Sequence, residues 1–250
     1  MPGCVGPCKL SILILYEFKL KNIFLPASSL AFLQLLAANN DREWFARNKA
    51  AYQTELAHME TFVDALLQQL NQYDVIETAS GKKSLYRIYR DVRFSKDKTP
   101  FSTYWGGRFR RAGKQRRGGY YYHFEPGNKS FVLAGFWGPN AHDLKLIRDD
   151  IAFDPEPLRR ILGDQTFVGN FGKLQGEQLK TSPNGYDRNH EAVDLLRFKQ
   201  FLVKRSFSDK EVLGKDFLSL ASQAFQQMRP FLDYMSEVLS AETNSAVAFI

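Results

Sequence analysis

The hydrophobic period of this chain changes near residue 85, and that change constrains the fold more than any other feature. Asp41 is suited to cap a long helix, in which apolar residues from Phe45 to Leu70 recur mostly three or four positions apart, the spacing of one buried helical face. The segments 85–94, 101–110, 120–125 and 130–137 instead tend towards apolar and polar alternation, which indicates strands. Because the turns between them are short, we predict an antiparallel sheet.

The last third of the chain returns to helical patterns. Asn140 and Asp154 are suited to cap helices, and Pro155 suits a first helical turn. Further along, we predict a helix over residues 190–198 and a strand over residues 201–207. We find no internal repeat, which argues against solenoid and propeller folds.

A capping box marks the C-terminal helical region. Ser208 and Glu211 have the spacing at which each side chain bonds the other residue's backbone N–H. Pro230 is expected to bend or restart the helix that follows. Helices, then strands, then helices again predict an α+β fold, with N-terminal helices, a central mainly antiparallel sheet and C-terminal helices packed on it.

The chain is long enough to form one substantial core. With 250 residues, 44% of them hydrophobic, it needs no metal or disulfide to fold. We predict a single α+β domain over residues 28–250. Residues 1–27 are expected to be an N-terminal extension, either disordered or the product of a start codon placed too early.

The cysteines and apolar runs bear on location. Cys4 and Cys8 both lie in the N-terminal extension, so no disulfide framework holds the body and a cytoplasmic location is expected. Residues 10–16 weakly resemble the apolar part of a signal peptide. Charged residues end that run well short of the ~20 residues that a membrane span needs. We therefore expect no membrane partner.

Positive charge is concentrated in residues 81–117. This stretch has thirteen lysines and arginines against two aspartates, a net charge of +11, whereas the rest of the chain is −4. The formal net charge of +7 therefore belongs to one region. Such a field attracts an anionic partner.

Residues 85–94 carry the first part of that charge. On a strand, Arg87, Asp91 and Arg93 share one face, where guanidinium groups can hold a multiply charged anion between them. On a helix, Arg87, Arg90 and Asp91 would cluster instead. We prefer the strand, because tyrosine, isoleucine, valine and phenylalanine favour a pleated surface.

The turn after this segment adds groups that bind phosphate, namely two lysines, two hydroxyls and backbone N–H groups. We assign the ligand-binding role to Arg87, Arg90, Arg93, Lys96 and Lys98. The alternative is a solvated basic surface in which Asp91 and Asp97 pair with neighbouring cations.

Residues 108–117 are a second basic segment with a different composition. Arginine and lysine alternate there with alanine and glycine, as in a hairpin loop that contacts nucleic-acid phosphates without reading bases. The alternative, which we favour, is a mobile solvated tip.

Three residues are candidates for proton transfer, Asp91, His123 and Asp187. His123 shares a strand face with Tyr121 and Glu125, which fits either acid–base chemistry or a cross-strand aromatic and polar surface. Tyr186, beside Asp187 at a helix start, is assigned to ligand binding. The four histidines show no metal-ligand spacing, so we predict no metal site, and no cofactor can be identified.

Two motifs resemble a known family. Residues 87–100 read RIYRDVRFSKDKTP and residues 39–45 read NNDREWF. Together with GYD at 185–187 and LLRFK at 195–199, they resemble the family called domain of unknown function 2461. The resemblance implies a single intracellular α+β domain without an assigned activity, and it favours a pocket at residues 87–98 over the second basic segment.

The leading hypothesis is a cytoplasmic protein that binds a small anionic, phosphate-bearing ligand through residues 87–98. One alternative is a nucleic-acid-binding module that uses residues 108–117. Another is a scaffold whose basic face docks an acidic protein. The sequence leaves open the ligand, any turnover of it, and whether Asp91, His123 and Asp187 share a pocket.

Overall fold

The protein is described by a computed structural model over residues 23–113 and 116–247, with side chains through residue 240. The N-terminal part comprises α2 (Ala27–Ala38), α3 (Arg42–Arg47), α4 (Lys49–Leu70) and α5 (Gly81–Ser84). The next elements are β1 (Trp105–Arg110), β2 (Gly119–Phe124), β3 (Ser130–Phe136) and α6 (Ala141–Phe153). The rest comprises α7 (Glu156–Gly163), α8 (Gln165–Phe171), α9 (Val193–Leu196), β4 (Phe201–Phe207), α10 (Asp209–Val212) and α11 (Phe217–Val247). Residues 1–22 of the predicted extension lie outside the described residues.

The first helices begin at residues that favour capping. The Asp41 carboxylate accepts a hydrogen bond from the Trp44 N–H (2.8 Å) and so caps α3. The sequence predicts one long helix from Asp41, but the structure has two, because the backbone at Asn48 leaves helical geometry. The second of them, α4, fully buries Met59 and Leu66 from the predicted apolar stripe.

The four strands form an antiparallel sheet in the order β1-β2-β3-β4, which confirms the predicted pairing. β4 has the predicted bounds, and β2 and β3 agree with segments 120–125 and 130–137 to within one residue at each end. The β2–β3 hairpin turns at Gly127 and Asn128, which have φ of 86° and 60°. The Asp209 carboxylate accepts hydrogen bonds from both backbone N–H groups (2.8 and 2.9 Å) and fixes the turn.

The strand predicted over residues 85–94 is wrong. Two isolated bridges take its place, Leu85 with Gly107 and Tyr89 with Phe101. Beyond them, the Asp91 carboxylate accepts a hydrogen bond from the Arg93 N–H (3.2 Å), so local side-chain bonds replace a strand ladder. The predicted strand 101–110 likewise begins only at Trp105.

Two helices of the C-terminal third begin at the predicted caps. The Asn140 side chain accepts a hydrogen bond from the Asp143 N–H (2.8 Å) at the start of α6, and α7 follows Asp154 and Pro155. The helix predicted over residues 190–198 is reduced to α9, because the residues just before α9 form a turn.

The predicted capping box is present. The Ser208 N–H donates to the Glu211 carboxylate (2.8 Å), and the Glu211 N–H donates to the Ser208 hydroxyl (3.3 Å). It starts only the short α10, however, and α11 begins separately. Pro230 does not restart the helix, since α11 continues through it. Of the helices in the described part of the chain, none combines the length and apolar content needed to cross a bilayer.

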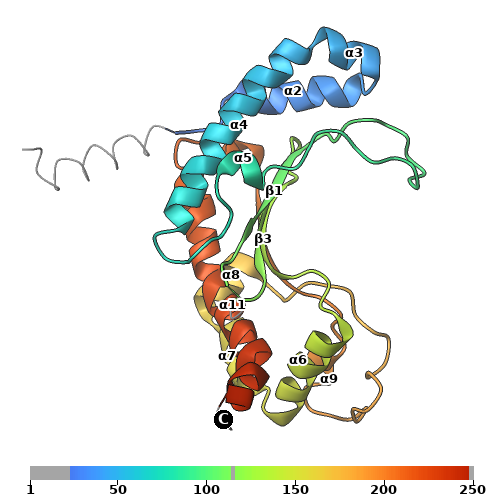
Figure 1. Ribbon diagram of the computed structural model, residues 1–250, viewed down its shortest axis with the longest axis vertical. Helices are drawn as coiled ribbons and strands as arrows, with labels where there is room; N and C mark the ends of the chain where they lie inside the picture. The colour runs from blue at the N-terminus through green and yellow to red at the C-terminus, as the bar shows by residue number, and fades with distance from the viewer. Residues whose placement is uncertain (1–22, 114–115, 248–250) are drawn as a thin grey trace, which may run out of the picture.

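α4 and α11 lie on one side of the sheet and enclose the core with it (Figure 1). Phe62 of α4 stacks on Phe217 of α11 with ring centroids 5.5 Å apart, and it meets Phe124 of β2 edge-on at 5.7 Å. Tyr122 is completely buried in the same layer. The C-terminal helix therefore packs on the sheet as predicted, and the fold is α+β.

The other side of the sheet, which we call the open face, is flanked rather than covered in Figure 1. A long loop over residues 86–104, which we call the arm, projects from the upper end of the sheet on this side. α6 and α9 lie on the same side near the lower end. The open face is where polar and aromatic side chains gather.

Candidate functional site

One row of side chains crosses the open face on all four strands. The register pairs Arg108 of β1 with Tyr121 of β2, Tyr121 with Leu133 of β3, and Leu133 with Lys204 of β4. Because side chains alternate along a strand, this row points away from the core that holds Tyr122. The row therefore has the cations Arg108 and Lys204 at its ends, with Tyr121 and Leu133 between them.

A cavity of about 600 Å³ lies beside this row, within the usual size range of ligand pockets. Its charged lining consists of Arg108, Arg110, Arg117 and Asp143, and its aromatic lining of Tyr86, Phe109, Tyr120, Tyr121, Phe136 and Trp137. Gly119 and Gly135, which face each other across β2 and β3, also line it and contribute no side chains. Backbone, rings and guanidinium groups thus meet in one hollow.

The aromatic side chains of the cavity form a connected wall. The Tyr121 ring lies 6.0 Å from the Tyr86 ring and 5.2 Å from the Trp137 ring, between centroids. Tyr86 and Trp137 keep about half of their surface exposed, at 47% and 51%. Ring faces that remain accessible can stack against a flat group of a ligand.

The three arginines of the cavity differ in their partners. Arg110 forms an ion pair with Glu77 (3.0 Å), and Arg117 forms one with Asp143. Arg108 is exposed, and among the described residues none forms a hydrogen bond or ion pair with its guanidinium. Arg108 therefore keeps its full hydrogen-bonding capacity for an anion.

His123 lies next to the row, on the same face of β2. Its Nε2 lies 2.7 Å from the Glu125 carboxylate, and its Nδ1 lies 3.2 Å from the Tyr121 hydroxyl. Its ring is stacked between Tyr104 and Phe131, at 4.2 and 4.7 Å between centroids. Burial lowers the pKa of His123 despite Glu125, which favours a neutral imidazole.

That protonation state sets the direction of the hydrogen bonds. An ionised Glu125 accepts the Nε2–H of His123, so Nδ1 is left to accept from the Tyr121 hydroxyl. Burial raises the pKa of Tyr121, so this hydroxyl keeps its proton. His123, oriented by Glu125, thus holds the Tyr121 hydroxyl at the cavity wall. The catalytic role of His123 stays a prediction.

The five basic residues predicted to bind ligand lie on the arm. Asp91 pairs with Arg93 (2.7 Å), and Asp97 pairs with Arg90 (2.6 Å). The Lys98 ammonium donates to the Val92 carbonyl (3.0 Å). Arg87 and Lys96 are exposed, and the described side chains include no partner for either.

The base of the arm is anchored to the N-terminal helices. The Asn40 side chain accepts from the Phe101 N–H (3.1 Å) and donates to the Phe101 carbonyl (2.9 Å). Phe101 also stacks on Phe45 of α3, with centroids 4.0 Å apart. The motif at residues 39–45 thus holds the arm that carries the motif at residues 87–100.

Tyr186 and Asp187 belong to a third segment. The Tyr186 hydroxyl donates to the Asp149 carboxylate of α6 (2.7 Å), while burial, followed by this contact, raises the pKa of Tyr186 to about 12. The Asp187 carboxylate accepts from the Asn189 N–H (2.9 Å). The loop between α8 and α9 that carries both lies at the opposite end of the sheet from the arm (Figure 1). Asp91, His123 and Asp187 are therefore spread along the molecule.

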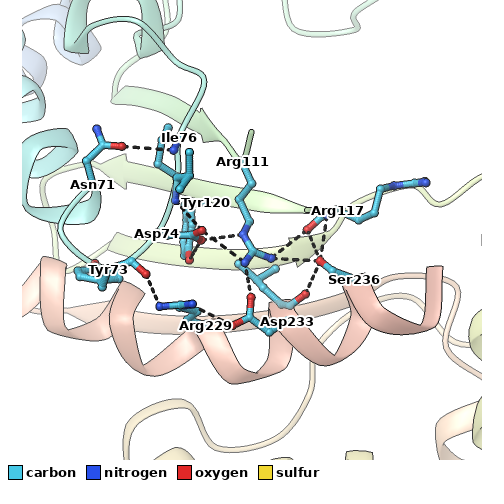
Figure 2. Close-up of polar contacts among 12 residues, drawn as sticks. Asn71, Tyr73, Asp74, Ile76, Arg111, Arg117, Tyr120, Arg229, Asp233 and Ser236 are labelled. Carbon is cyan, nitrogen blue, oxygen red and sulfur yellow. Dashed lines mark hydrogen bonds and ion pairs between the residues drawn. The ribbon is translucent and has the colours of Figure 1, made fainter. Parts of the chain in front are cut away.

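The second basic segment is not a mobile tip as a whole. Arg108 and Arg110 belong to β1, while Arg111 is completely enclosed, with 3% of its surface exposed. Figure 2 shows the Arg111 guanidinium between Asp74 (2.7 Å) and Asp233. Lys114 and Gln115 lie outside the described residues.

The buried network around Arg111 is nearly complete in its hydrogen bonds. The Tyr120 hydroxyl donates to Asp74 (2.7 Å), and the Arg111 guanidinium also donates to the Ser236 hydroxyl (3.1 Å) (Figure 2). Burial alone would lower the pKa of Arg111, but Asp233 and Asp74 outweigh it and the net shift is upward. A cation paired in this way is unavailable to a ligand, and its removal would leave a buried carboxylate without a counter-charge.

Sequence reasoning missed that Arg108, Tyr86 and Trp137 line one cavity. A usable signal was present, because Arg108 and Arg110 alternate with the buried Phe109, as expected for the outer face of a strand. The predicted strand 101–110 contained both arginines, but counting them with the basic loop at residues 108–117 concealed that pattern. Tyr86 and Trp137 reach the cavity from outside the regular strands, so no strand period marks them.

A family model described as conserved hypothetical protein (DUF2461) matches residues 28–234. This match confirms the resemblance carried by the motifs at residues 39–45 and 87–100. No curated protein and no solved structure matches the chain.

Proposed function

The chain belongs to the DUF2461 family of conserved hypothetical proteins, and from its geometry we propose that it binds a small anionic ligand carrying a flat ring, such as a nucleotide. The binding site is the open-face cavity beside Arg108. The observation that carries the proposal is an unpaired guanidinium in a hollow with exposed aromatic rings. The cytoplasmic location expected from the sequence stays part of the proposal.

The charge of the cavity supports an anionic ligand. Arg110 and Arg117 each have a carboxylate partner, so their charges are largely offset, whereas Arg108 contributes an uncompensated positive charge. Guanidinium groups bind phosphate through two parallel hydrogen bonds, which adds both strength and direction. The phosphate-bearing ligand expected from the sequence therefore fits better beside Arg108 than on the arm, where Arg90 and Arg93 already have partners.

The aromatic wall supports a ligand with a ring. A bare phosphate would occupy only a small part of a cavity of about 600 Å³ and would leave Tyr86 and Trp137 uncovered. A nucleobase placed against these rings would bury their exposed faces. Stacking of this kind contributes about 1–3 kcal/mol per base in proteins that bind single strands.

Calorimetric titration with thymidine monophosphate, thymidine and inorganic phosphate tests the proposal. We expect the monophosphate to bind at least about tenfold more tightly than either part, because it uses the guanidinium and the rings together. The substitution Arg108→Gln should weaken monophosphate binding at least about tenfold, through loss of charge-assisted hydrogen bonds.

Lys210→Gln is the matched control, because it also removes one exposed positive charge but lies on α10. It should leave monophosphate binding within about twofold of the unsubstituted protein, as expected for a distant surface charge. Equal binding by Arg108→Gln and the unsubstituted protein, with both folded, would contradict the proposal. So would the absence of any binding by the monophosphate.

A further inference from the structure

We infer that the natural ligand is a single-stranded nucleic acid, with one nucleotide at the open-face cavity and the following phosphates along the arm. The inference rests on the proposed function and extends it from a nucleotide to a strand. It depends on three features of the arm: its continuity with the cavity, its unpaired cations and its exposed phenylalanine.

The arm begins at the cavity wall. Tyr86, which lines the cavity, donates its backbone N–H to the Gly106 carbonyl (2.8 Å). Its ring lies beside Tyr121, and the charge of Arg108 acts on its phenol. The next residue along the arm is Arg87, which is exposed. A ligand that leaves the cavity past Tyr86 therefore meets the cations of the arm.

The tip of the arm is ordered by its own hydrogen bonds. The Asp97 carboxylate accepts from the Thr99 N–H (2.9 Å) and from Arg90, and the first of these bonds contributes most to lowering the pKa of Asp97 to about 2. Asp91 is paired with Arg93 in the same way. Both acidic groups of the arm are thus neutralised internally, and a partner meets a pre-organised positive surface.

Net positive charge remains on the arm after this pairing. Residues 86–104 contain five lysines and arginines against two aspartates, a net charge of +3. Arg87 and Lys96, which have no partner among the described side chains, lie on opposite sides of Phe94 in the chain. Cations distributed along an extended segment suit a polymer of phosphates better than one compact anion.

Phe94 gives the arm an exposed aromatic ring. It is 96% exposed, and the Arg93 guanidinium lies 5.9 Å from the centre of its ring. The two form a platform of ring and cation on which a base can stack. An acidic peptide would supply the negative charge but would offer no regular series of flat rings to this platform.

The reach of the arm agrees with an oligonucleotide. The nine residues from Tyr86 to Phe94 span at most about 30 Å when extended, so a strand of about eight nucleotides is an adequate probe. Sites that combine a basic track with stacking aromatics bind single strands with little sequence preference. We therefore expect no requirement for a particular base along the arm.

Fluorescence anisotropy with labelled octathymidylate tests the inference, alongside the thymidine monophosphate titration. The octamer should bind at least about tenfold more tightly than the monophosphate, and its log affinity should fall with log salt by about 0.7 per phosphate contacted. Arg87→Ala with Lys96→Ala should weaken octamer binding at least about tenfold and reduce that slope by up to about 1.4, while monophosphate binding stays unchanged. Phe94→Ala should weaken octamer binding about fivefold or more.

The matched control is Lys210→Ala with Lys215→Ala, which removes two exposed charges outside the arm and should leave octamer binding within about twofold. If the monophosphate binds but the octamer binds no more tightly, the inference is overturned and the proposed function stands. If neither binds, both fail. Octamer binding that survives the arm substitutions, or equally tight binding of polyglutamate, would also overturn the inference.

Discussion

Arg108 and Arg111 lie three positions apart in one basic run and have opposite surroundings. Arg111 is enclosed and bonded to Asp74, Asp233 and Ser236, whereas Arg108 is exposed beside a cavity and has no described partner. The number of charges in the segment therefore says little about where a ligand binds. The useful quantity is the positive charge left unpaired after the fold has formed.

The difference follows from strand geometry. Arg108 is on β1 with its side chain directed to the open face, opposite Tyr121. Arg111 follows the last residue of β1 and turns toward α11, where it meets Asp233 of that helix and Asp74 of the loop after α4 (Figure 2). A buried guanidinium without such partners would be strongly destabilising.

The largest effect should come from removing the buried guanidinium. Arg111→Met leaves Asp74 without its cation, and we expect the free energy of unfolding to fall by about 3–5 kcal/mol in urea denaturation. Arg108→Gln should change it by less than about 0.5 kcal/mol, as is usual for exposed positions. Similar losses of unfolding free energy in the two variants would contradict the difference between a buried, paired Arg111 and an exposed, unpaired Arg108.

A smaller loss is expected at Tyr120, whose hydroxyl donates to Asp74 in the same network. Tyr120→Phe deletes that donor without changing the ring, and hydrogen bonds to charged groups contribute about 1.5–3 kcal/mol. Thermal and urea unfolding should both show the loss, and nucleotide binding on the open face should be unaffected. An unchanged free energy of unfolding would mean that Arg111 and the Val75 N–H satisfy the Asp74 carboxylate without the Tyr120 hydroxyl.

Much of the helical and hairpin structure could be predicted because its signals are local. The α4 stripe, the Asp41 and Asn140 caps and the β2–β3 turn each depend on residues a few positions apart. The strand expected at residues 85–94 is reduced to isolated bridges. Beyond them the Asp91 side chain bonds the Arg93 N–H in place of a ladder partner, and propensity does not report that competition.

The candidate site was harder to predict, because residues distant in the sequence decide which arginines are paired and which aromatic rings meet. The partners of Arg111 lie 37 and 122 positions away, so nothing near it in sequence indicates burial. The same holds for Tyr121 and Tyr86, which meet only after β2 pairs with β1. Residue types alone identified the basic region, but pairing in the fold decides which of its cations are free.

The pH dependence of stability should report on His123 of the open face. Burial lowers the pKa of His123 below its ordinary value of 6.5, so the unfolded chain binds the proton more readily. The stability that neutral His123 contributes is therefore present above pH 6.5 and declines as the pH falls below it. In urea denaturation, the free energies of unfolding of the unsubstituted protein and of His123→Gln should approach each other as the pH falls below 6.5. A difference between the two that grows toward low pH would contradict a lowered pKa of His123 in the folded protein.

The smallest effect on stability is expected on the arm, whose tip bonds lie at the surface. Asp97→Ala removes the acceptor for the Thr99 N–H and the partner of Arg90. We expect an unchanged melting temperature but faster amide hydrogen exchange at Thr99, because only local order is lost. A marked drop in melting temperature would mean that the tip contributes to the core.

The most direct test is a titration of the ¹⁵N-labelled protein with thymidine monophosphate, observed through the arginine Nε–Hε signals. We expect the Arg108 signal to shift to saturation while the signal of Arg111, which is already bonded to Asp74 and Asp233, stays in place. An Arg108 signal that does not move at saturating nucleotide would show that the unpaired guanidinium does not bind the ligand.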